Sequence, residues 1–243
     1  FQDAGLVYET EYTYFVTAMD AAGNQSFASE RVSGQPFNSL GPLAPTGLRA
    51  FAHNLYILSQ LDIALDWDAS PESDLAQYRV YRSLLSTFAP DSTTLRAAVT
   101  APRFVDEEVQ VGTVYHYRVT ALDRGGKESQ PSEEVSDIPL ALPELEAPVQ
   151  GALASATPTF RWQPVAGARR YQVVVTTSPT SGEISAIPPT AQTAAVWVGR
   201  PERDGRPTAL SPGQLYYWKV IASTRQDGLE NSVSRVESFK VRR

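Results

Sequence analysis

The sequence predicts an all-β protein made of tandem antiparallel β-sandwiches that form an extended rod. Three observations carry this prediction: a long internal repeat, segments in which apolar and polar residues alternate, and turn residues between those segments. The chain has 243 residues, of which 42% are hydrophobic, so it can build two full domains and part of a third. We expect no amphipathic helix.

The internal repeat is the strongest of the three observations. Residues 1–33 match residues 104–136 at a constant shift of 103 without a gap, which chance does not produce over such a length. A more distant third copy at 210–222 is shifted by 101, so the period is about 100 residues, the size of an immunoglobulin-like sandwich. The matched pairs include Phe1 with Phe104, Asp3 with Asp106, Tyr12 with Tyr115, Tyr14 with Tyr117, Val16 with Val119, Ser26 with Ser129 and Ser29 with Ser132.

Alternation of side-chain type predicts the strands themselves. In residues 61–67, apolar side chains at every second position alternate with Asp62, Ala64 and Asp66, which is the pattern of a half-buried antiparallel strand. The same period is found in residues 115–121, and residues 78–82 read as a further strand with Tyr78 and Val80 inward. Turn pairs such as Gly125-Gly126 and Pro212-Gly213 follow at the expected spacing.

These segments resemble the bacterial branch of the fibronectin type III family. The resemblance rests on WDASPESDLAQYRVYR at 67–82 and VYHYRVTALDRGGKES at 114–129. It implies that Trp67 is the buried tryptophan of strand B and that Tyr115 is the corner tyrosine before strand F. The third copy repeats the pattern with Trp162, Tyr171 and Tyr216.

Domain boundaries follow from the repeat. Residues 1–36 are expected to be the last strands of a partial module, whose other strands would lie upstream or come from another chain. A complete module is expected at 43–138 and a more divergent one at 147–243. The linker at 138–148 contains several prolines, which restrict φ, so we expect semi-rigid spacers between modules.

Composition excludes several function classes. The net charge of −6 disfavours nucleic acid as the main partner, and the absence of Cys excludes disulfides, thiolate metal sites and Cys nucleophiles. The two histidines, His53 and His116, have no companion ligands at metal-binding spacing and are expected to face solvent. No hydrolase or nucleotide-binding motif is present, so we expect no enzyme activity and no cofactor.

An acidic cluster around the loop after the strand at 61–67 is a candidate calcium site, because Ca²⁺ prefers oxygen ligands. Its spacing matches no known calcium loop, and its serine and aspartate side chains are suited to bonding nearby backbone amides. We therefore predict no metal. The cluster consists of Asp66, Asp68, Glu72 and Asp74.

An apolar run is the first candidate interface. Leu55, Tyr56, Ile57 and Leu58 are consecutive, and a strand cannot turn four successive side chains toward one core. The run could form an exposed protein contact, or it could bulge or pair with a neighbouring module.

A tryptophan and a charged insertion form a second group of candidates. Trp197 could be an exposed platform for sugar stacking or a partner contact, or it could lie in the core, and Tyr81 is the other aromatic considered for stacking. The insertion at 199–207 places Arg200, Arg203 and Arg206 in a loop that is either solvated or binding.

Charge is unevenly distributed along the chain. Residues 144–243 hold 12 Lys and Arg against 8 Asp and Glu, whereas the remaining residues hold 9 against 19. The third module, with Lys240, Arg242 and Arg243 near its end, could therefore dock on an anionic surface in a salt-dependent way.

The leading functional interpretation is a non-catalytic structural or protein-interaction subunit. It would scaffold or stabilise a larger extracytoplasmic or membrane-associated bacterial complex and bind other protein subunits, in the periplasm or at the cell surface. No apolar run reaches the ~20 residues of a membrane helix. Because the first module is expected to be partial, an export signal or a lipid anchor could lie upstream. The alternative is a spacer or glycan-binding accessory region of a secreted polysaccharide-degrading enzyme or adhesin. A receptor ectodomain is a third, weaker interpretation.

Overall fold

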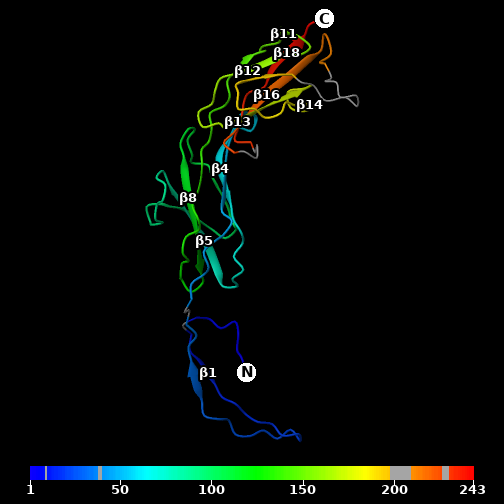
Figure 1. Cartoon of the computed structure of the whole chain (residues 1–243). Helices are drawn as coiled ribbons and strands as arrows, with labels where there is room; N and C mark the ends of the chain where they lie inside the picture. Colours follow the sequence, from blue (N-terminus) through cyan, green and yellow to red (C-terminus); the bar gives the residue numbers. More distant parts are fainter. Residues whose placement is uncertain (9, 38–39, 198–208, 226–229) are drawn as a thin grey trace.

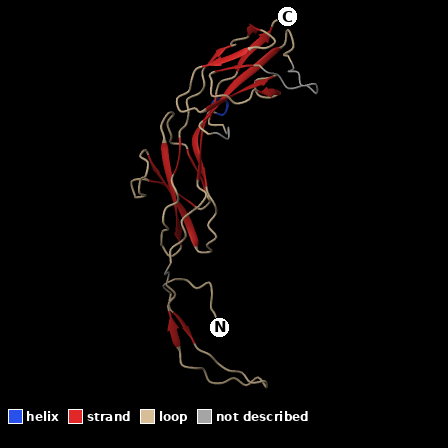
Figure 2. Cartoon of the chain, in the orientation of Figure 1, coloured by secondary structure: helices blue, strands red, loops and turns tan. Residues whose placement is uncertain are grey.

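The computed structural model describes residues 1–8, 10–37, 40–197, 209–225 and 230–243. Within these ranges every regular element is a β-strand except one turn of 3-10 helix, η1 (Tyr56–Leu58). The strands form successive units along an elongated arrangement, with the chain ends far apart (Figures 1 and 2). The all-β prediction is confirmed.

The middle sandwich has two antiparallel sheets that enclose one core. Its four-stranded sheet has the order β6-β5-β8-β9, and the opposite layer is formed by β3, β4 and β7. Alternate residues of β8 point into the core: Tyr117 and Val119 are fully buried, as the period-two pattern predicts. The strands are β3 (Arg49–Leu55), β4 (Gln60–Asp66), β5 (Leu75–Ser83), β6 (Leu95–Val99), β7 (Arg103–Asp106), β8 (Tyr115–Asp123) and β9 (Val135–Asp137).

The C-terminal sandwich repeats this plan around a second core. A three-stranded sheet, β10-β12-β15, faces a layer in which β16 pairs with β13, β17 and β18. The strands are β10 (Leu145–Ala147), β11 (Ala152–Ala154), β12 (Thr159–Trp162), β13 (Arg170–Thr176), β14 (Glu183–Ala186), β15 (Ala194–Val196), β16 (Leu215–Ser223), β17 (Ser232–Val233) and β18 (Glu237–Val241).

Each core is built around a tryptophan and a tyrosine from adjacent segments. Trp67 meets the ring of Tyr78 edge-on at 5.3 Å, and Trp162 meets Tyr171 at 5.5 Å. All four side chains are buried, which confirms their expected core positions. At the place of Tyr117 the C-terminal sandwich has Trp218, whose indole N–H donates to the Pro148 carbonyl at 2.6 Å.

The N-terminal segment forms a two-stranded antiparallel hairpin of β1 (Tyr12–Tyr14) and β2 (Val32–Gly34). Its residues correspond to the buried strand β8, yet Val16 is 72% exposed whereas its counterpart Val119 is fully buried. The hairpin therefore keeps the local backbone pattern of the module although, in the described ranges, no second layer covers it.

A tyrosine corner recurs in all three units. The phenol oxygens of Tyr12, Tyr115 and Tyr216 each accept a hydrogen bond from the backbone N–H five residues upstream, at 3.0 Å. This geometry fixes the turn that enters the long strand, and it confirms the corner role that the resemblance implies for Tyr115.

Replacing Tyr115 with phenylalanine is expected to lower the free energy of unfolding by about 1–2 kcal/mol, because the Gln110 N–H loses its acceptor at a partly buried site. Urea unfolding followed by tryptophan fluorescence measures the loss. Tyr56→Phe is the matched control: Tyr56 is 45% exposed, and the change should stay within about 0.5 kcal/mol. Equal losses in both variants would contradict the proposed stabilising role of the corner.

The serines of the repeat accept hydrogen bonds from backbone N–H groups that a paired strand would otherwise satisfy. The Ser132 hydroxyl accepts from the Val119 N–H at 3.0 Å, and the Ser29 hydroxyl accepts from the Val16 N–H at 2.9 Å. In the C-terminal sandwich the Ser234 hydroxyl accepts from the Val220 N–H at 3.0 Å. A hydroxyl at this place satisfies a backbone donor that the irregular last strand leaves without a carbonyl partner.

A polar cluster on the four-stranded sheet of the middle sandwich centres on Glu128. Its carboxylate accepts hydrogen bonds from the Tyr81 and Thr120 hydroxyls and pairs with Arg79. Burial by itself would raise the pKa of Glu128, but the hydrogen bonds from Thr120 and Tyr81 and the charge of Arg79 outweigh it. The pKa of Glu128 is therefore held below its ordinary value.

This lowered pKa predicts a loss of stability in acid. The unfolded chain takes up a proton at Glu128 near its ordinary pKa of 4.5, whereas the folded chain does so only at lower pH. The contribution is therefore complete above that value and is lost as the pH falls through the folded pKa. Urea unfolding between about pH 5 and pH 3 should show a shallower decline for Glu128→Gln than for the wild type. The exposed Glu133→Gln should keep the wild-type slope, and a Glu128→Gln slope equal to it would refute the prediction.

Candidate interaction site at the module junction

The two sandwiches share a sheet. The end of β3 in the middle sandwich pairs in parallel with β17 of the C-terminal sandwich, with Asn54 opposite Ser232 and Leu55 opposite Val233. The Asn54 N–H donates to the Asn231 carbonyl at 2.7 Å. As a result, one nine-stranded sheet runs through both units.

Asn231 is the central polar residue of this junction. Its side-chain carbonyl accepts from the Leu140 N–H, and its amide donates to the Ile138 carbonyl, both at 2.9 Å. The side chain of Asn54 donates to the Leu140 carbonyl at 2.8 Å, and the Ser232 hydroxyl donates to the Ala141 carbonyl at 2.8 Å. The segment between the sandwiches is therefore bonded from both sides.

Asp137 makes a second polar bridge. One carboxylate oxygen accepts from the Ala52 N–H at 2.9 Å, and the other accepts from the Ile138 N–H at 2.8 Å and the Thr224 hydroxyl at 3.1 Å. Asp137 is only 9% exposed, so these bonds form in a site with little water. Such charge-assisted bonds are stronger than neutral ones.

Apolar and aromatic contacts complete the junction. Leu55 packs against Val174, Ile221 and Val233 on the outer face of the C-terminal sheet. The guanidinium of Arg225 lies 5.1 Å from the ring centroid of Phe51, and that of Arg235 lies 5.1 Å from the ring of Tyr56. In these two cation–π contacts the cation and the ring come from different sandwiches.

The segment expected to be a linker is part of this packing. Leu140 is fully buried in the C-terminal core, and Ile138 packs against the same core. The two sandwiches are therefore not separated by a free-standing linker, because the chain that joins them already packs in the C-terminal core. This is a correction to the expected linker at 138–148.

The apolar run at 55–58 is partly packed against the neighbouring module and partly exposed. Leu55 pairs with the neighbouring module, which is one of the two outcomes that its sequence left open. Ile57 and Leu58 remain 48% and 68% exposed on η1, which ends at Ser59 in the left-handed region (φ 49°). The tight turn therefore presents two aliphatic side chains to solvent beside the junction.

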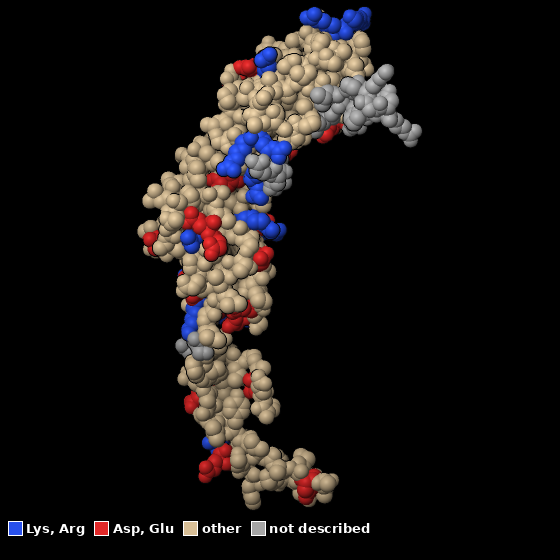
Figure 3. Space-filling view, in the orientation of Figure 1, with Lys and Arg blue, Asp and Glu red and all other residues tan. Residues whose placement is uncertain are grey.

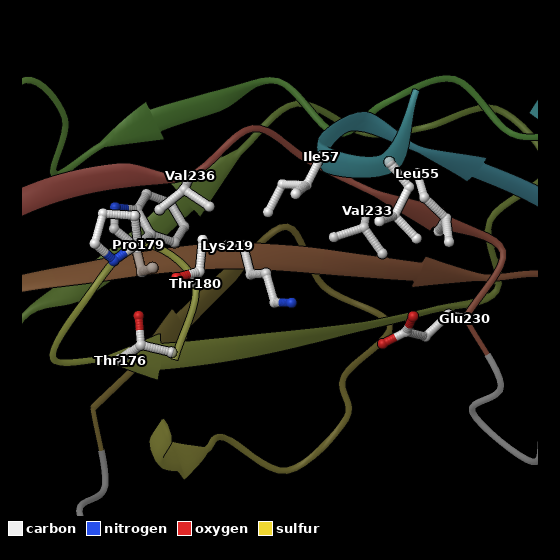
Figure 4. A pocket seen from close by; sticks show the side chains of 11 residues that line it. Leu55, Ile57, Thr176, Pro179, Thr180, Lys219, Glu230, Val233 and Val236 are labelled. Carbon is white, nitrogen blue, oxygen red and sulfur yellow. The ribbon is translucent and has the colours of Figure 1, made fainter. Parts of the chain in front are cut away.

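A cavity of about 250 Å³ lies beside these exposed residues. Leu55, Ile57 and Leu58 line it from the middle sandwich, and Val233 and Val236 line it from the C-terminal sandwich. Figure 4 shows Ile57, Leu55 and Val233 near one another, with Lys219 beside Thr180 near the centre and Glu230 at the lower right of this view. The cavity exists only while the two sandwiches keep this arrangement.

The two aromatics considered for sugar stacking are buried. Trp197 is 3% exposed in the C-terminal core, and Tyr81 is 5% exposed with its hydroxyl on Glu128. The exposed alternative for Trp197 was therefore wrong and the core alternative holds: Trp197 follows the end of β15, where its backbone N–H bonds to the Pro158 carbonyl at 2.8 Å.

Of the basic residues proposed as contacts, the structure describes those at the C-terminal end but not those in the insertion at 199–207. Lys240, Arg242 and Arg243 are exposed at the C-terminal end, where Figure 3 shows Lys and Arg gathered. A second basic group in Figure 3 lies near the junction of the sandwiches. Three candidates, Arg200, Arg203 and Arg206, lie outside the described residues.

Each residue of the acidic cluster has a protein partner. Asp66 pairs with Arg49, Asp68 accepts from the Thr46 hydroxyl, Glu72 accepts from the Leu43 N–H, and Asp74 accepts from the Tyr8 hydroxyl of the N-terminal segment. Among the described residues, no group of three or more His, Asp or Glu is placed to hold a metal ion.

The histidines were expected to face solvent, and both are partly exposed: His116 lies on the outer face of β8, between the inward-facing Tyr115 and Tyr117. His53 and His116 have side chains only 24% and 16% exposed, and they lie 2.7 Å from Asp62 and 3.0 Å from Glu134, respectively. The first pairing joins the neighbouring strands β3 and β4, and the second joins β8 to the residue that precedes β9, which the sequence does not reveal.

The junction residues Asn231 and Asp137 were missed by sequence reasoning. Asp137 is the last residue of β9 and Asn231 precedes β17, and no periodicity or motif distinguishes either from other polar residues of the sequence. In the parts of the chain that the structure describes, no helix has the length and apolar character needed to cross a membrane.

Comparison with known proteins gives partial relatives. No family model matches the chain. Exoglucanase B of Cellulomonas fimi is 33% identical over 172 residues, which cover 65% of this chain and 14% of that protein. Chitinase A1 of Niallia circulans is 32% identical over 139 residues, which cover 55% of this chain and 18% of that protein. The chain therefore spans less than a fifth of the length of either relative.

Solved structures similar to this chain carry related descriptions. A Fn3-like protein from Clostridium thermocellum is 32% identical, with a TM-score of 0.33 over 39% of this chain and 90% of that one. The chicken CNTN1 FN1-FN3 domains are 17% identical, with a TM-score of 0.45 over 98% of this chain and 80% of that one.

The type of module follows from the repeated features of the chain itself. Antiparallel layers enclose a tryptophan–tyrosine pair in both cores, and a corner tyrosine stands at the start of β1, β8 and β16 in the three units. The sequence motifs at 67–82 and 114–129 match the same pattern. The chain is a tandem of fibronectin type III-like β-sandwich modules.

Proposed function

We propose that this chain is a non-catalytic, rigid spacer within a larger extracytoplasmic protein that acts on polysaccharide. The observation that carries the proposal is the junction, where a shared sheet and buried polar bonds hold two sandwiches in one orientation. A spacer of this kind sets the distance and the angle between the parts that it separates.

The relatives support the polysaccharide context of the proposal. Their names are those of an exoglucanase and a chitinase, and this chain matches only a small part of each. A direct sugar-binding role has less support, because Trp197 and Tyr81 are buried and cannot stack on a sugar ring. We therefore favour spacing over glycan binding.

Rigidity can be tested by distance measurement between the sandwiches. The chain has no cysteine, so Ser92→Cys and Ser211→Cys, both at exposed positions, can carry a pair of spin labels. Pulsed electron–electron double resonance should give one narrow distribution of distances between the two spin labels of the double variant. A broad distribution, typical of a flexible linker, would refute the rigid spacer.

Glycan binding is tested separately by co-sedimentation of the full chain with insoluble cellulose and chitin. We expect the chain to stay in the supernatant. Retention on either polysaccharide, competed by its oligosaccharides, would replace the spacer proposal with a glycan-binding one.

A scaffold role in a membrane-associated or envelope assembly is the second candidate. It is favoured by the exposed Ile57 and Leu58 and by the basic side chains of Lys240, Arg242 and Arg243. Chemical cross-linking of intact envelopes, followed by mass spectrometry, tests it. Stoichiometric cross-links from residues near 57 or 240 to one protein complex would favour the scaffold, and their absence would leave the spacer.

A further inference from the structure

We propose that the cavity at the module junction binds an extended peptide segment of a second protein. The segment would insert one aliphatic or aromatic side chain between Ile57 and Val236, with an acidic residue near Lys219 and a basic residue near Glu230. This goes beyond the spacer role, because it assigns a binding site and a partner chemistry to the joint between the modules.

The wall of the cavity already packs against an aliphatic side chain of this chain, Leu55. Leu55 packs on Val174, Ile221 and Val233, so the outer face of the C-terminal sheet accepts an aliphatic side chain at the junction. The cavity is the continuation of this interface, since Leu55 and Val233 line both. A second aliphatic side chain entering beside them would bury the exposed Ile57 and Leu58, and removal of that apolar area from water drives binding.

The size of the cavity favours a single side chain. At about 250 Å³ it lies below the ~300–1,000 Å³ of sites for drug-sized ligands. Protein interfaces concentrate their binding energy in a few side chains that fill pockets of this kind. The cavity is therefore suited to one anchor residue and not to an oligosaccharide or a cofactor.

The charges at the border select among partners. Lys219 from β16 and Glu230, which precedes β17, are of opposite sign. An anionic lipid surface would gain attraction from Lys219 and repulsion from Glu230, whereas a peptide can match both with opposite charges on either side of its anchor. Charge complementarity thus favours a peptide over a membrane.

The test is selection of random seven-residue peptides, displayed on phage, against the immobilised full chain. We expect the enriched peptides to share one aliphatic or aromatic residue flanked by an acidic and a basic residue. Synthetic copies should bind Ile57→Asp about tenfold or more weakly than the wild type, a loss of about 1.4 kcal/mol. Leu58→Asp, at a more exposed position, provides a second variant if Ile57→Asp unfolds.

The matched control is Val105→Asp. Val105 is 48% exposed, as Ile57 is, but it lies on β7 outside the cavity, so the selected peptides should bind this variant as they bind the wild type. The proposal is overturned if no peptide is enriched or if peptides bind Ile57→Asp undiminished. It is also overturned if the wild type, but not Ile57→Asp, forms dimers in sedimentation or binds phosphatidylglycerol vesicles, because the occupant is then a second copy or a membrane.

Discussion

Replacing Asn231 with alanine is expected to lower the free energy of unfolding by about 3 kcal/mol and to release the two sandwiches from their fixed orientation. The side chain is 2% exposed and bonds both the Leu140 N–H and the Ile138 carbonyl. The variant leaves both backbone groups without their partner, and each unsatisfied buried group costs about 1–3 kcal/mol. Urea unfolding measures the stability, and the spin-label pair at 92 and 211 measures the orientation.

The control for this variant is Asn24→Ala. Asn24 is exposed in the N-terminal hairpin, where its amide bonds to Asp20 at 2.8 Å. Its loss should change the stability by no more than about 0.5 kcal/mol and leave the distance distribution narrow. If Asn231→Ala also keeps a narrow distribution, the polar bonds are not what fixes the orientation, and the strand pairing of β3 with β17 must suffice.

Replacing Asp106 with asparagine is expected to cost about 3–5 kcal/mol, the usual penalty for breaking a buried ion pair. Asp106 is fully buried, lies 2.8 Å from Arg82 and 3.1 Å from Arg96, and accepts from the Tyr117 hydroxyl at 3.0 Å. Burial first, and then the negative charge of Asp106, raise the pKa of the Tyr117 phenol, so it remains a donor. Without the carboxylate, Arg82 loses the partner of its ion pair, and Arg96 keeps only the exposed Glu108. Urea unfolding at neutral pH measures the loss.

Asp66→Asn provides the exposed counterpart of that change. Asp66 pairs with Arg49 at 2.6 Å, but the two side chains are 45% and 55% exposed, so water already screens the pair. Its loss should cost at most about 1 kcal/mol. If the two variants lose equal stability, burial of the Asp106 pair is not what makes it important.

The same aspartate–tyrosine contact recurs in the N-terminal hairpin, where the Tyr14 hydroxyl donates to Asp3 at 2.9 Å. Asp3 and Tyr14 match Asp106 and Tyr117 in the repeat, so the sequence alignment correctly paired residues that make the same bond. Local contacts of this kind survive without a surrounding core, because both partners lie within one short stretch of chain.

The sequence alone determined the fold class, the tryptophan and tyrosine core and the corner tyrosines. Each of these depends on a pattern inside one module, either the period-two alternation of a strand or a bond between residues a few positions apart. Such patterns repeat wherever the module repeats, so three copies in one chain reinforce the same prediction.

The tertiary structure decided the rest. The bond of Asn231 to Leu140 joins residues 91 positions apart, and the pairing of Leu55 with Val233 joins strands of different modules. The burial of Trp197 depends on how the chain turns at the end of β15. None of these has a sequence period. The two junction contacts depend on the angle at which whole modules pack against each other, whereas the position of Trp197 depends on the packing of the C-terminal core as a whole.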